Sequence, residues 1–484
     1  MQRRISILMT AMTAVLILCS TGCGTEAGQG ARNILSEELE ISSEETETTS
    51  KENDIPSKEV EPTSGDISGD ACDVILGDEQ FDKYLPMLEG KRVALFSNHT
   101  GIVGDETSGI GELSKGEDAS LVHFGTDADG EEISYGEHIL DALIEHGVNV
   151  TAIFSPEHGF RGTEDAGALV DDSVDEKTGV PILSLYADDN THAPSEESME
   201  QFDVLIVDMQ DVGLRYYTYY ISMYYLMDAC TSEGKEFIIL DRPNPNGFYV
   251  DGPILREEYK SNVGQLPIPV VYGMTWGELA QMINGEGWLS SGKESCDLKV
   301  IPCRNYTHQT KTSLIRNPSP NIKDMRAVYL YASTCFFENT AISVGRGTEF
   351  PFEAYGSPYL EGVAGFDFSF TPVSMSGANE PPFMDENCFG IDLRETPISE
   401  IWEKQINLDY LVGAYHAISE HAPEVSFWGT SDKEGHYWID KLTGTDEVRL
   451  QIEEGLSAEE IKAGWQDEIN LFLEQRSPYL LYEE

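Results

Sequence analysis

Basic residues are scarce in this sequence, and their scarcity excludes a large class of partners. The 484 residues include 31 lysines and arginines against 86 aspartates and glutamates, a formal net charge of −55. Binding to nucleic acid depends on clustered Lys and Arg that meet the phosphates. We therefore expect no nucleic acid as a partner, and the charge suits a secreted protein kept soluble by self-repulsion.

Two motifs are also missing. No Gly-x-Gly-x-x-Gly follows any of the strands predicted below, so a dinucleotide cofactor is unsupported and we expect no cofactor. No Cys-x-x-Cys pair occurs, and no histidine spacing indicates zinc. Outside the cell one or two disulfides could form, but the spacing does not pair the cysteines. Cys230 and Cys335 lie in apolar runs, where we expect buried free thiols.

Long hydrophobic runs are missing too. The first apolar run, residues 5–19, is too short for a transmembrane helix, and it follows Arg3 and Arg4 as in a secretory signal. The next four residues, Ser-Thr-Gly-Cys, resemble a bacterial lipoprotein cleavage box in which Cys23 is lipidated. The alternative is an ordinary secretory signal with an incidental cysteine. Both place the protein outside the cytoplasm, and the first anchors it to the cell membrane through the N-terminal lipid alone.

The segment after this signal, residues 24–75, is acidic and polar and almost free of aromatic residues. Such a composition cannot bury enough apolar surface to offset the entropy of ordering, so we expect a disordered tether.

The body of the chain alternates apolar strands with helical patterns. Short apolar runs predict strands near residues 93–96, 148–154, 181–186, 202–208 and 235–242, and residues 135–147 have helical spacing that ends at a glycine. This alternation is typical of βαβ units, so we predict a parallel, Rossmann-like sheet.

Polar residues follow these strands. Asn98 follows the first strand, and Glu157, His158 and Arg161 follow the second around a flexible glycine. In open α/β sheets ligands bind outside the carboxyl ends of the strands, and a carboxylate, an imidazole and a guanidinium there suit an acid–base site. The alternative is a loop that caps the strand, with Glu157 and Arg161 paired to each other.

The next strands repeat the arrangement. The fourth is followed by Asp208, Gln210, Asp211, Arg215, Tyr216 and Tyr217, and the fifth by Asp241, Arg242, Asn244 and Asn246. Acids and amides bind hydroxyl groups and aromatic rings pack on sugar faces, so their convergence predicts a sugar site. For any single strand end, the alternative is a satisfied cap or a local salt bridge.

Several ordered blocks give the sequence a specific resemblance. Residues 155–162 (SPEHGFRG), 208–219 (DMQDVGLRYYTY), 240–247 (LDRPNPNG), 272–280 (YGMTWGELA) and 336–349 (FFENTAISVGRGTE) resemble the NamZ (YbbC-type) exo-β-N-acetylmuramidase family. The similarity covers roughly residue 88 to the end and leaves out the acidic tether. It implies release of N-acetylmuramic acid from the non-reducing ends of peptidoglycan fragments, so that muropeptides or disaccharides are the partners.

The resemblance also implies an α/β architecture of two domains. A Rossmann-like N-terminal domain, residues 76–293, would be joined to a smaller C-terminal α/β domain, residues 294–484, with the active-site cleft between them. We expect residues 298–303 to open the second domain as a strand, and a helix capped by Ser457 to continue through Phe472.

Hydrolysis of a β-glycoside needs an acid at the leaving oxygen and a base or nucleophile opposite, for which the carbonyl of a 2-acetamido group can substitute. Glu157 is our candidate acid, because it follows a buried strand and precedes a glycine, and His158 would share or orient its proton. Asp211 is our candidate second carboxylate, for activating water or positioning the acetamido group, with Asp208 as the next choice.

The other candidates would bind the substrate. Arg215 and Arg346 match the lactyl carboxylate of muramic acid, since a guanidinium binds a carboxylate bidentately. Four residues would close the cleft from the second domain, namely Asn317, Asn321, Glu338 and Glu349. For Glu349 the alternative is a salt bridge to Arg346.

Two other functions stay open. Asp208, Asp211, Asp241 and His158 could converge on one metal ion, although the chemistry above requires none. The protein could also be a non-catalytic lipoprotein that binds muropeptides for a transporter. The many carboxylates at strand ends argue against that function, because capture of an anionic sugar favours Arg and Lys.

Overall fold

A computed structural model describes residues 74–104, 136–156, 160, 173–185, 193–292 and 295–484. Several residues that the sequence singles out lie outside these ranges. They are Cys23, nearly all of the expected tether, and the strand-end residues Glu157, His158 and Arg161.

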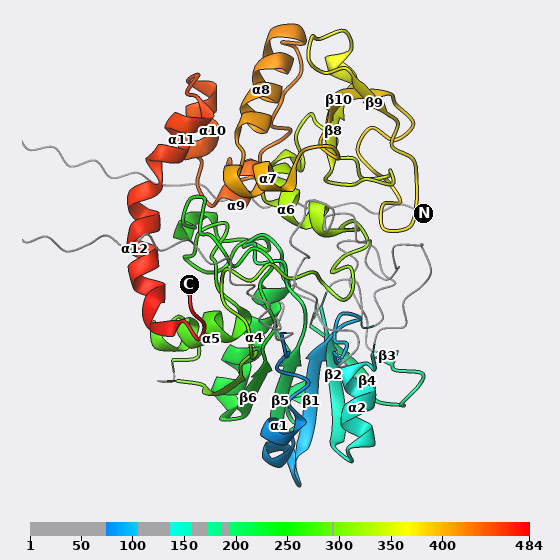
Figure 1. The fold of residues 1–484 in the computed structure, drawn as a ribbon, viewed down its shortest axis with the longest axis vertical. Helices are drawn as coiled ribbons and strands as arrows, with labels where there is room; N and C mark the ends of the chain where they lie inside the picture. Colours follow the sequence, from blue (N-terminus) through cyan, green and yellow to red (C-terminus); the bar gives the residue numbers. More distant parts are fainter. Residues whose placement is uncertain (1–73, 105–135, 157–159, 161–172, 186–192, 293–294) are drawn as a thin grey trace, which may run out of the picture. The chain divides into compact units, whose positions relative to one another are not determined.

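Seven strands form one sheet in the spatial order β3-β4-β2-β1-β5-β6-β7. Figure 1 shows this order from β3 to β6. β3 pairs antiparallel with β4, and all other neighbours pair in parallel. Without β3, the strands lie in the order third, second, first, fourth, fifth, sixth, which is the Rossmann order. The strands are β1 (Arg92–Ser97), β2 (Asn149–Ser155), β3 (Ser173–Val174), β4 (Pro181–Ser184), β5 (Val204–Asp208), β6 (Glu236–Leu240) and β7 (Asp297–Ile301).

The central parallel strands are mainly apolar because both faces of the sheet are covered there. Successive side chains point to opposite faces, so Val93 and Leu95 of β1 join one core cluster, and Ala94 and Phe96 join the other. The first cluster includes residues of α1 (Phe81–Leu88) and α2 (Ile139–Glu145). The second includes residues of α4 (Tyr219–Glu233) and α5 (Trp276–Gly285), and α3 (Glu196–Met199) precedes β5.

The C-terminal part contains a smaller antiparallel sheet and most of the helices. Its strands lie in the order β8-β10-β9, and its core belongs to the same cluster as α4 and α5. Figure 1 shows α12 running from α10 and α11 to the neighbourhood of α5. The elements are β8 (Ala354–Ser357), β9 (Phe368–Phe370), β10 (Cys388–Asp392), α6 (Met325–Thr334), α7 (Ile398–Lys404), α8 (Asp409–His421), α9 (Trp438–Thr443), α10 (Glu447–Glu453), α11 (Ala458–Gly464) and α12 (Gln466–Arg476).

Two expectations about this part are corrected. β7, expected to open the second domain, pairs with β6, so the large sheet extends beyond the boundary expected at residues 293–294. The expected single helix after Ser457 is two helices, because the chain turns at Trp465, whose indole donates a hydrogen bond to Asp251. The predicted cap is confirmed: Ser457 and Glu460 form a capping box.

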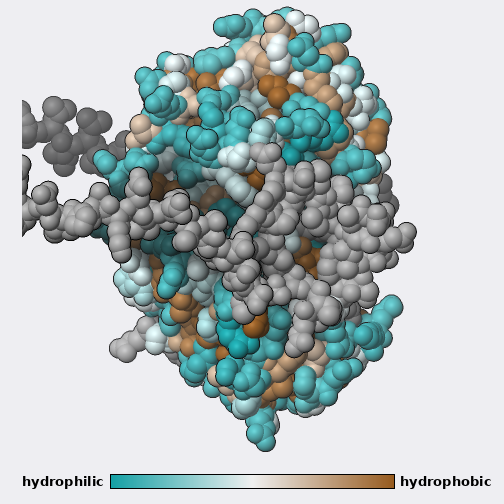
Figure 2. Space-filling model, in the orientation of Figure 1, coloured by the Kyte–Doolittle hydropathy of each residue, from teal (hydrophilic) through white to brown (hydrophobic). Residues whose placement is uncertain are grey.

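The described cysteines are buried and unpaired, which confirms free thiols at Cys230 and Cys335. Within the described ranges no helix is long and apolar enough to span a membrane. The face drawn in Figure 2 is largely hydrophilic where it is coloured, as expected for a chain so rich in carboxylates.

Candidate active site

The strand order reverses between β1 and β5, which is where ligands bind in sheets of this kind. Ser97 and Asp208, the last residues of these strands, are register partners. Just beyond them, the Thr100 hydroxyl donates to Asn98 Oδ1 at 2.6 Å and accepts from the Gln210 amide at 3.0 Å, which joins the two strand ends. Asn98 Nδ2 is buried and donates to no described residue, so an amide donor is held at the reversal point.

Asp208 lies at this point but is fully engaged elsewhere. Arg242 donates from Nε to Oδ1 at 2.6 Å and from Nη2 to Oδ2 at 3.0 Å, and also binds Asp78 at 2.7 Å. All three side chains are buried. Burial raises the pKa of Asp208, while the charge of Arg242 lowers it. The geometry therefore favours a structural ion cluster over the catalytic and substrate-binding roles predicted for Asp208 and Arg242.

The polar residues after β6 are also used inside the protein. Asp241 accepts from Thr275 Oγ1 at 2.7 Å, Tyr482 Oη at 2.5 Å and the Gly277 amide at 2.9 Å. Asn244 and Asn246 donate to backbone carbonyls at 2.8 Å each. These bonds tie the turn after β6 to α5 and to the C-terminal segment. They favour structural roles for the three side chains over the sugar contacts predicted for them.

Asp211 differs from these residues. Its Oδ2 accepts from the Gly213 amide at 2.7 Å and from Tyr272 Oη at 2.8 Å, whereas Oδ1 is buried and accepts from no described residue. Burial raises the pKa of Asp211 to about 6, against the lowering effect of these hydrogen bonds. A carboxyl group with such a pKa exists in both protonation states near neutral pH, as an acid–base group must.

A small enclosed cavity of about 10 Å³, the size of about one water molecule, borders the Asp211 carboxyl group. Trp276 also lines it, and its indole N–H favours the ionised carboxylate and so acts to lower the pKa of Asp211. The cavity lies where β5 and β6 end, between Asp211 and the first residues of α5.

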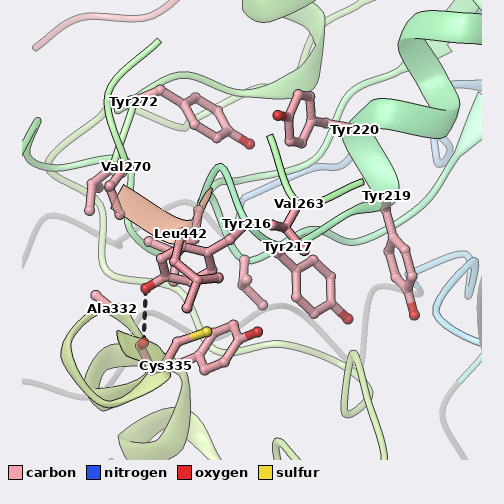
Figure 3. Packing of buried hydrophobic residues seen from close by; sticks show 14 of the residues in the cluster. Tyr216, Tyr217, Tyr219, Tyr220, Val263, Val270, Tyr272, Ala332, Cys335 and Leu442 are labelled. Carbon is pink, nitrogen blue, oxygen red and sulfur yellow. Dashed lines mark hydrogen bonds between the residues drawn. The ribbon is translucent and has the colours of Figure 1, made fainter. Parts of the chain in front are cut away.

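A larger cavity of about 310 Å³ lies between the N-terminal and C-terminal parts. Tyr216 and Tyr217, which precede α4, line one side, and Glu338 and Arg346 line the other. Figure 3 shows the two tyrosine rings beside Cys335 and Leu442. Tyr216 Oη donates to the Tyr331 carbonyl at 2.9 Å and Tyr217 Oη to the Pro318 carbonyl at 2.6 Å, so both rings are fixed across the junction. The volume is within the range of small-ligand sites.

Arg346 is the cationic group of this cavity. Its Nε donates to Glu338 Oε1 at 2.8 Å, and its guanidinium lies 4.9 Å from the centre of the Phe352 ring. Both side chains are only partly buried, and the two Nη groups donate to no residue within the described ranges. A guanidinium held through Nε, with its outer nitrogens available, suits recognition of a carboxylate.

Arg215, the other predicted carboxylate ligand, is a correction. It is fully buried and donates to the carbonyls of Pro253, Ile268 and Leu442 at 2.6–2.9 Å. Burial lowers its pKa to about 10. Three carbonyl acceptors without a carboxylate favour a structural role for Arg215, as a link between the two parts of the chain, over the predicted contact with the lactyl carboxylate.

The remaining predicted residues do not line either of the two cavities described above. Asn317 and Asn321 donate to the carbonyls of Ser319 and Gly377, at 3.1 and 2.7 Å. Glu349 is mostly exposed and pairs with Lys323 at 2.9 Å, which contradicts the alternative of a salt bridge to Arg346, and its substrate contact stays a prediction. Ser319 lines the larger cavity beside them, but these three side chains do not.

The sequence did not single out Tyr272, Trp276 or Trp438 for a role. Tyr272 and Trp276 belong to the 272–280 block, which does not follow a predicted strand, so the sequence assigned them no role. In the structure both lie beside the Asp211 carboxyl group. Trp438 opens α9, and only the fold brings it to the larger cavity. Among the residues with described positions, no group of three or more His, Cys, Asp or Glu is arranged to hold a metal ion.

The chain is similar in sequence and in fold to known proteins. A curated protein of Bacillus subtilis (strain 168), "Peptidoglycan beta-N-acetylmuramidase NamZ", is 32% identical over 413 residues, which cover 82% of this chain and 89% of that protein. A crystal structure of a DUF1343 family protein from Bacteroides fragilis has 49% identity and a TM-score of 0.70, over 85% of this chain and 100% of the other. A second DUF1343 family protein from that organism has 26% identity and a TM-score of 0.66, over 85% and 99%.

Two family models match consecutive parts of the chain. The model for the N-terminal domain of the exo-β-N-acetylmuramidase NamZ matches residues 93–326, and the model for its C-terminal domain matches residues 329–482. The cavity of about 310 Å³ is lined from both matched parts. The chain therefore belongs to the NamZ exo-β-N-acetylmuramidase family.

Proposed function

We propose that this protein is a peptidoglycan β-N-acetylmuramidase, a glycoside hydrolase that removes N-acetylmuramic acid from the non-reducing ends of peptidoglycan fragments. The match of both family models, across almost all of the chain after residue 92, carries the proposal. The cavity between the two matched parts supports it, because its size and lining suit a single amino sugar.

Recognition of muramic acid is assigned to Arg346. This sugar differs from N-acetylglucosamine by a lactyl group that ends in a carboxylate. Glu338 holds the Arg346 guanidinium through Nε and leaves both Nη groups for a bidentate bond to that carboxylate. Tyr216 and Tyr217 provide aromatic rings at the opposite wall for the sugar.

The chemistry requires one group to protonate the leaving oxygen and a second to act at the other face. Glu157, which follows β2, is the proposed acid, and His158 its partner. Asp211 is the proposed second carboxylate; it lines the small cavity beside Trp276, and the cavity of about 310 Å³ proposed for the sugar is lined from Tyr216, five residues further along the chain. Above its pKa of about 6 it is ionised and can accept the N–H of the 2-acetamido group or a proton from water. Tyr272 and the Gly213 amide fix the orientation of its carboxyl group.

The secretory signal expected from residues 1–23 would place the site of action outside the cytoplasm. We propose that Cys23 carries the lipid and that residues 24–75 act as a tether between the membrane and the folded part. Peptidoglycan fragments would then be cleaved outside the membrane.

A pair of chromogenic substrates tests the proposal. The purified protein is incubated with an aryl β-N-acetylmuramide and, in parallel, with the matching β-N-acetylglucosaminide. We expect turnover of the muramide alone, and a loss of about 10²-fold or more in kcat for Glu157→Gln with the fold intact. Full activity of Glu157→Gln would reject the acid assignment. Absence of turnover of both sugars by the wild type, with muropeptide retained, would identify a binding protein instead.

A further inference from the structure

The last residues of the chain contact the start of α5 and the turn after β6. The chain ends beside α5 (Figure 1), where the Leu481 amide donates to Glu278 Oε1 at 2.8 Å. Tyr482 Oη donates to Asp241 Oδ2 at 2.5 Å. Both contacted segments contribute lining residues to the small cavity beside the Asp211 carboxyl group, whereas the tail itself lines none of it. The tail therefore supports one wall of that cavity from outside.

Asp241 connects Tyr482 to the tryptophan in this wall. Its Oδ2 also accepts from Thr275 Oγ1 at 2.7 Å, and its Oδ1 accepts from the Gly277 amide at 2.9 Å. These two residues flank Trp276, the first residue of α5. Tyr482 and Thr275 bind the same carboxylate oxygen. Loss of the tyrosine hydroxyl therefore leaves Asp241 free to turn, and Trp276 can then move.

The position of Trp276 affects Asp211. The indole N–H favours the ionised carboxylate, against the burial that raises the pKa of Asp211 to about 6. This influence depends on distance and orientation, and the cavity that both groups line has room for only about one water molecule. The other titratable or charged groups that face Asp211 within the described ranges are Tyr217, Tyr220, Tyr272 and Arg242. Tyr482 donates to none of them, so its effect on Asp211 passes through Asp241 and Trp276.

We propose that Tyr482 is a positioning residue of the active site, which fixes Trp276 through Asp241 and so sets the environment of the Asp211 carboxyl group. The inference rests on the proposed function, since it takes Asp211 to be the second carboxylate of the hydrolase. Tyr482 lines neither the small cavity nor the cavity of about 310 Å³, so it has no contact with the sugar. Its role is therefore expressed in kcat and in the pH profile, and not in substrate binding.

Three single variants test this pathway. Tyr482→Phe removes the hydroxyl but keeps the ring, which packs against Tyr306 at a centroid distance of 4.9 Å. Tyr479→Phe is the matched control, because Tyr479 lies in the same tail and donates at 2.7 Å to Glu286, at the other end of α5. Trp276→Phe removes the indole N–H directly. For each protein, kcat and KM for the chromogenic muramide are measured between about pH 4 and 8, together with the melting temperature.

For Tyr482→Phe we expect kcat to fall about tenfold and KM to stay within about twofold of the wild type. The acidic limb of the pH profile of kcat/KM should move upward by about half to one pH unit, because Asp211 loses a group that favours its ionised form. Trp276→Phe should move the limb in the same direction. The double variant should move it no further than Trp276→Phe alone, since the hydroxyl acts through the indole. Tyr479→Phe should keep the wild-type limb.

A lower melting temperature for Tyr482→Phe, with kcat and the acidic limb unchanged, would overturn the proposal and leave the tail a purely structural role. Additive shifts in the double variant would also overturn it, and so would an unmoved limb in Trp276→Phe, whatever the effect of Tyr482→Phe. Wild-type protein that does not cleave the muramide would reject the proposed function itself. An active wild type whose acidic limb is shared by Tyr482→Phe would reject only the positioning role.

Discussion

Replacing Asp211 by asparagine should make the protein more stable at neutral pH and much less active. Burial raises the pKa of Asp211 from its ordinary value of 3.8 to about 6. The folded state therefore binds an extra proton between about pH 4 and 6. This side chain favours folding below pH 4 and loses that contribution as the pH rises through 6, because ionisation in a buried site is unfavourable.

With the pKa raised this far, the ionised carboxylate lowers the free energy of unfolding by about 3 kcal/mol at pH 7.5. A neutral asparagine would remove this cost. The side-chain N–H of the asparagine would face another donor, Trp276 Nε1, and this contact offsets part of the gain. We therefore expect the free energy of unfolding to rise by about 1–3 kcal/mol. At pH 4 the wild type is already neutral at this position, and the two proteins should be about equally stable. Activity on the muramide should fall by about 10²-fold or more, since the acid–base group is gone.

Urea unfolding at pH 4 and pH 7.5, together with kcat/KM on the chromogenic muramide, measures both effects. Asp241→Asn is the control: its pKa is also raised to about 6, but three donors occupy its carboxylate, so an amide there should destabilise the protein. A variant Asp211→Asn whose stability difference from the wild type is the same at both pH values would refute the raised pKa. Unchanged activity would refute the catalytic role.

Three further predictions concern neighbouring residues. Tyr272→Phe removes a donor that favours ionised Asp211, so the acidic limb of the pH profile of kcat/KM should move upward, and a limb that stays in place would count against the contact. A lysine at position 346 cannot bind Glu338 and also form a bidentate bond to a carboxylate, so Arg346→Lys should raise KM for the muramide about 10–100-fold with little change in the melting temperature. An unchanged KM with a lower melting temperature would contradict carboxylate binding. Arg215→Met leaves three buried carbonyls without a donor and should lower the free energy of unfolding by about 3–5 kcal/mol in urea, whereas a change in KM alone would restore its substrate role.

Much of the fold could be predicted from local patterns. Apolar runs predicted β1, β2, β4, β5 and β6, because strands covered on both faces are apolar throughout. Ser457 and Glu460 predicted a helix start, because the capping box needs only two residues at fixed spacing. β7 was assigned to the wrong domain because the pairing of an edge strand depends on residues distant in sequence.

The candidate site could be predicted only in outline. Strand ends indicated where polar residues gather, but the choice of partners is made in three dimensions. Asp208 and Asp241 are carboxylates at strand ends, as a catalytic carboxylate would be. In the structure, however, Arg242 donates hydrogen bonds to Asp208, and Thr275 and Tyr482 donate hydrogen bonds to Asp241. Asp211 keeps an oxygen without a described partner, which no spacing in the sequence reveals.

The central claim is tested most directly with two defined disaccharides that contain the same sugars in opposite order. The protein is incubated with N-acetylmuramic acid β-1,4-linked to N-acetylglucosamine, and with N-acetylglucosamine β-1,4-linked to N-acetylmuramic acid, and the products are separated by mass. We predict equimolar release of both sugars from the first and none from the second. Cleavage of the second disaccharide, or of neither, would contradict the account.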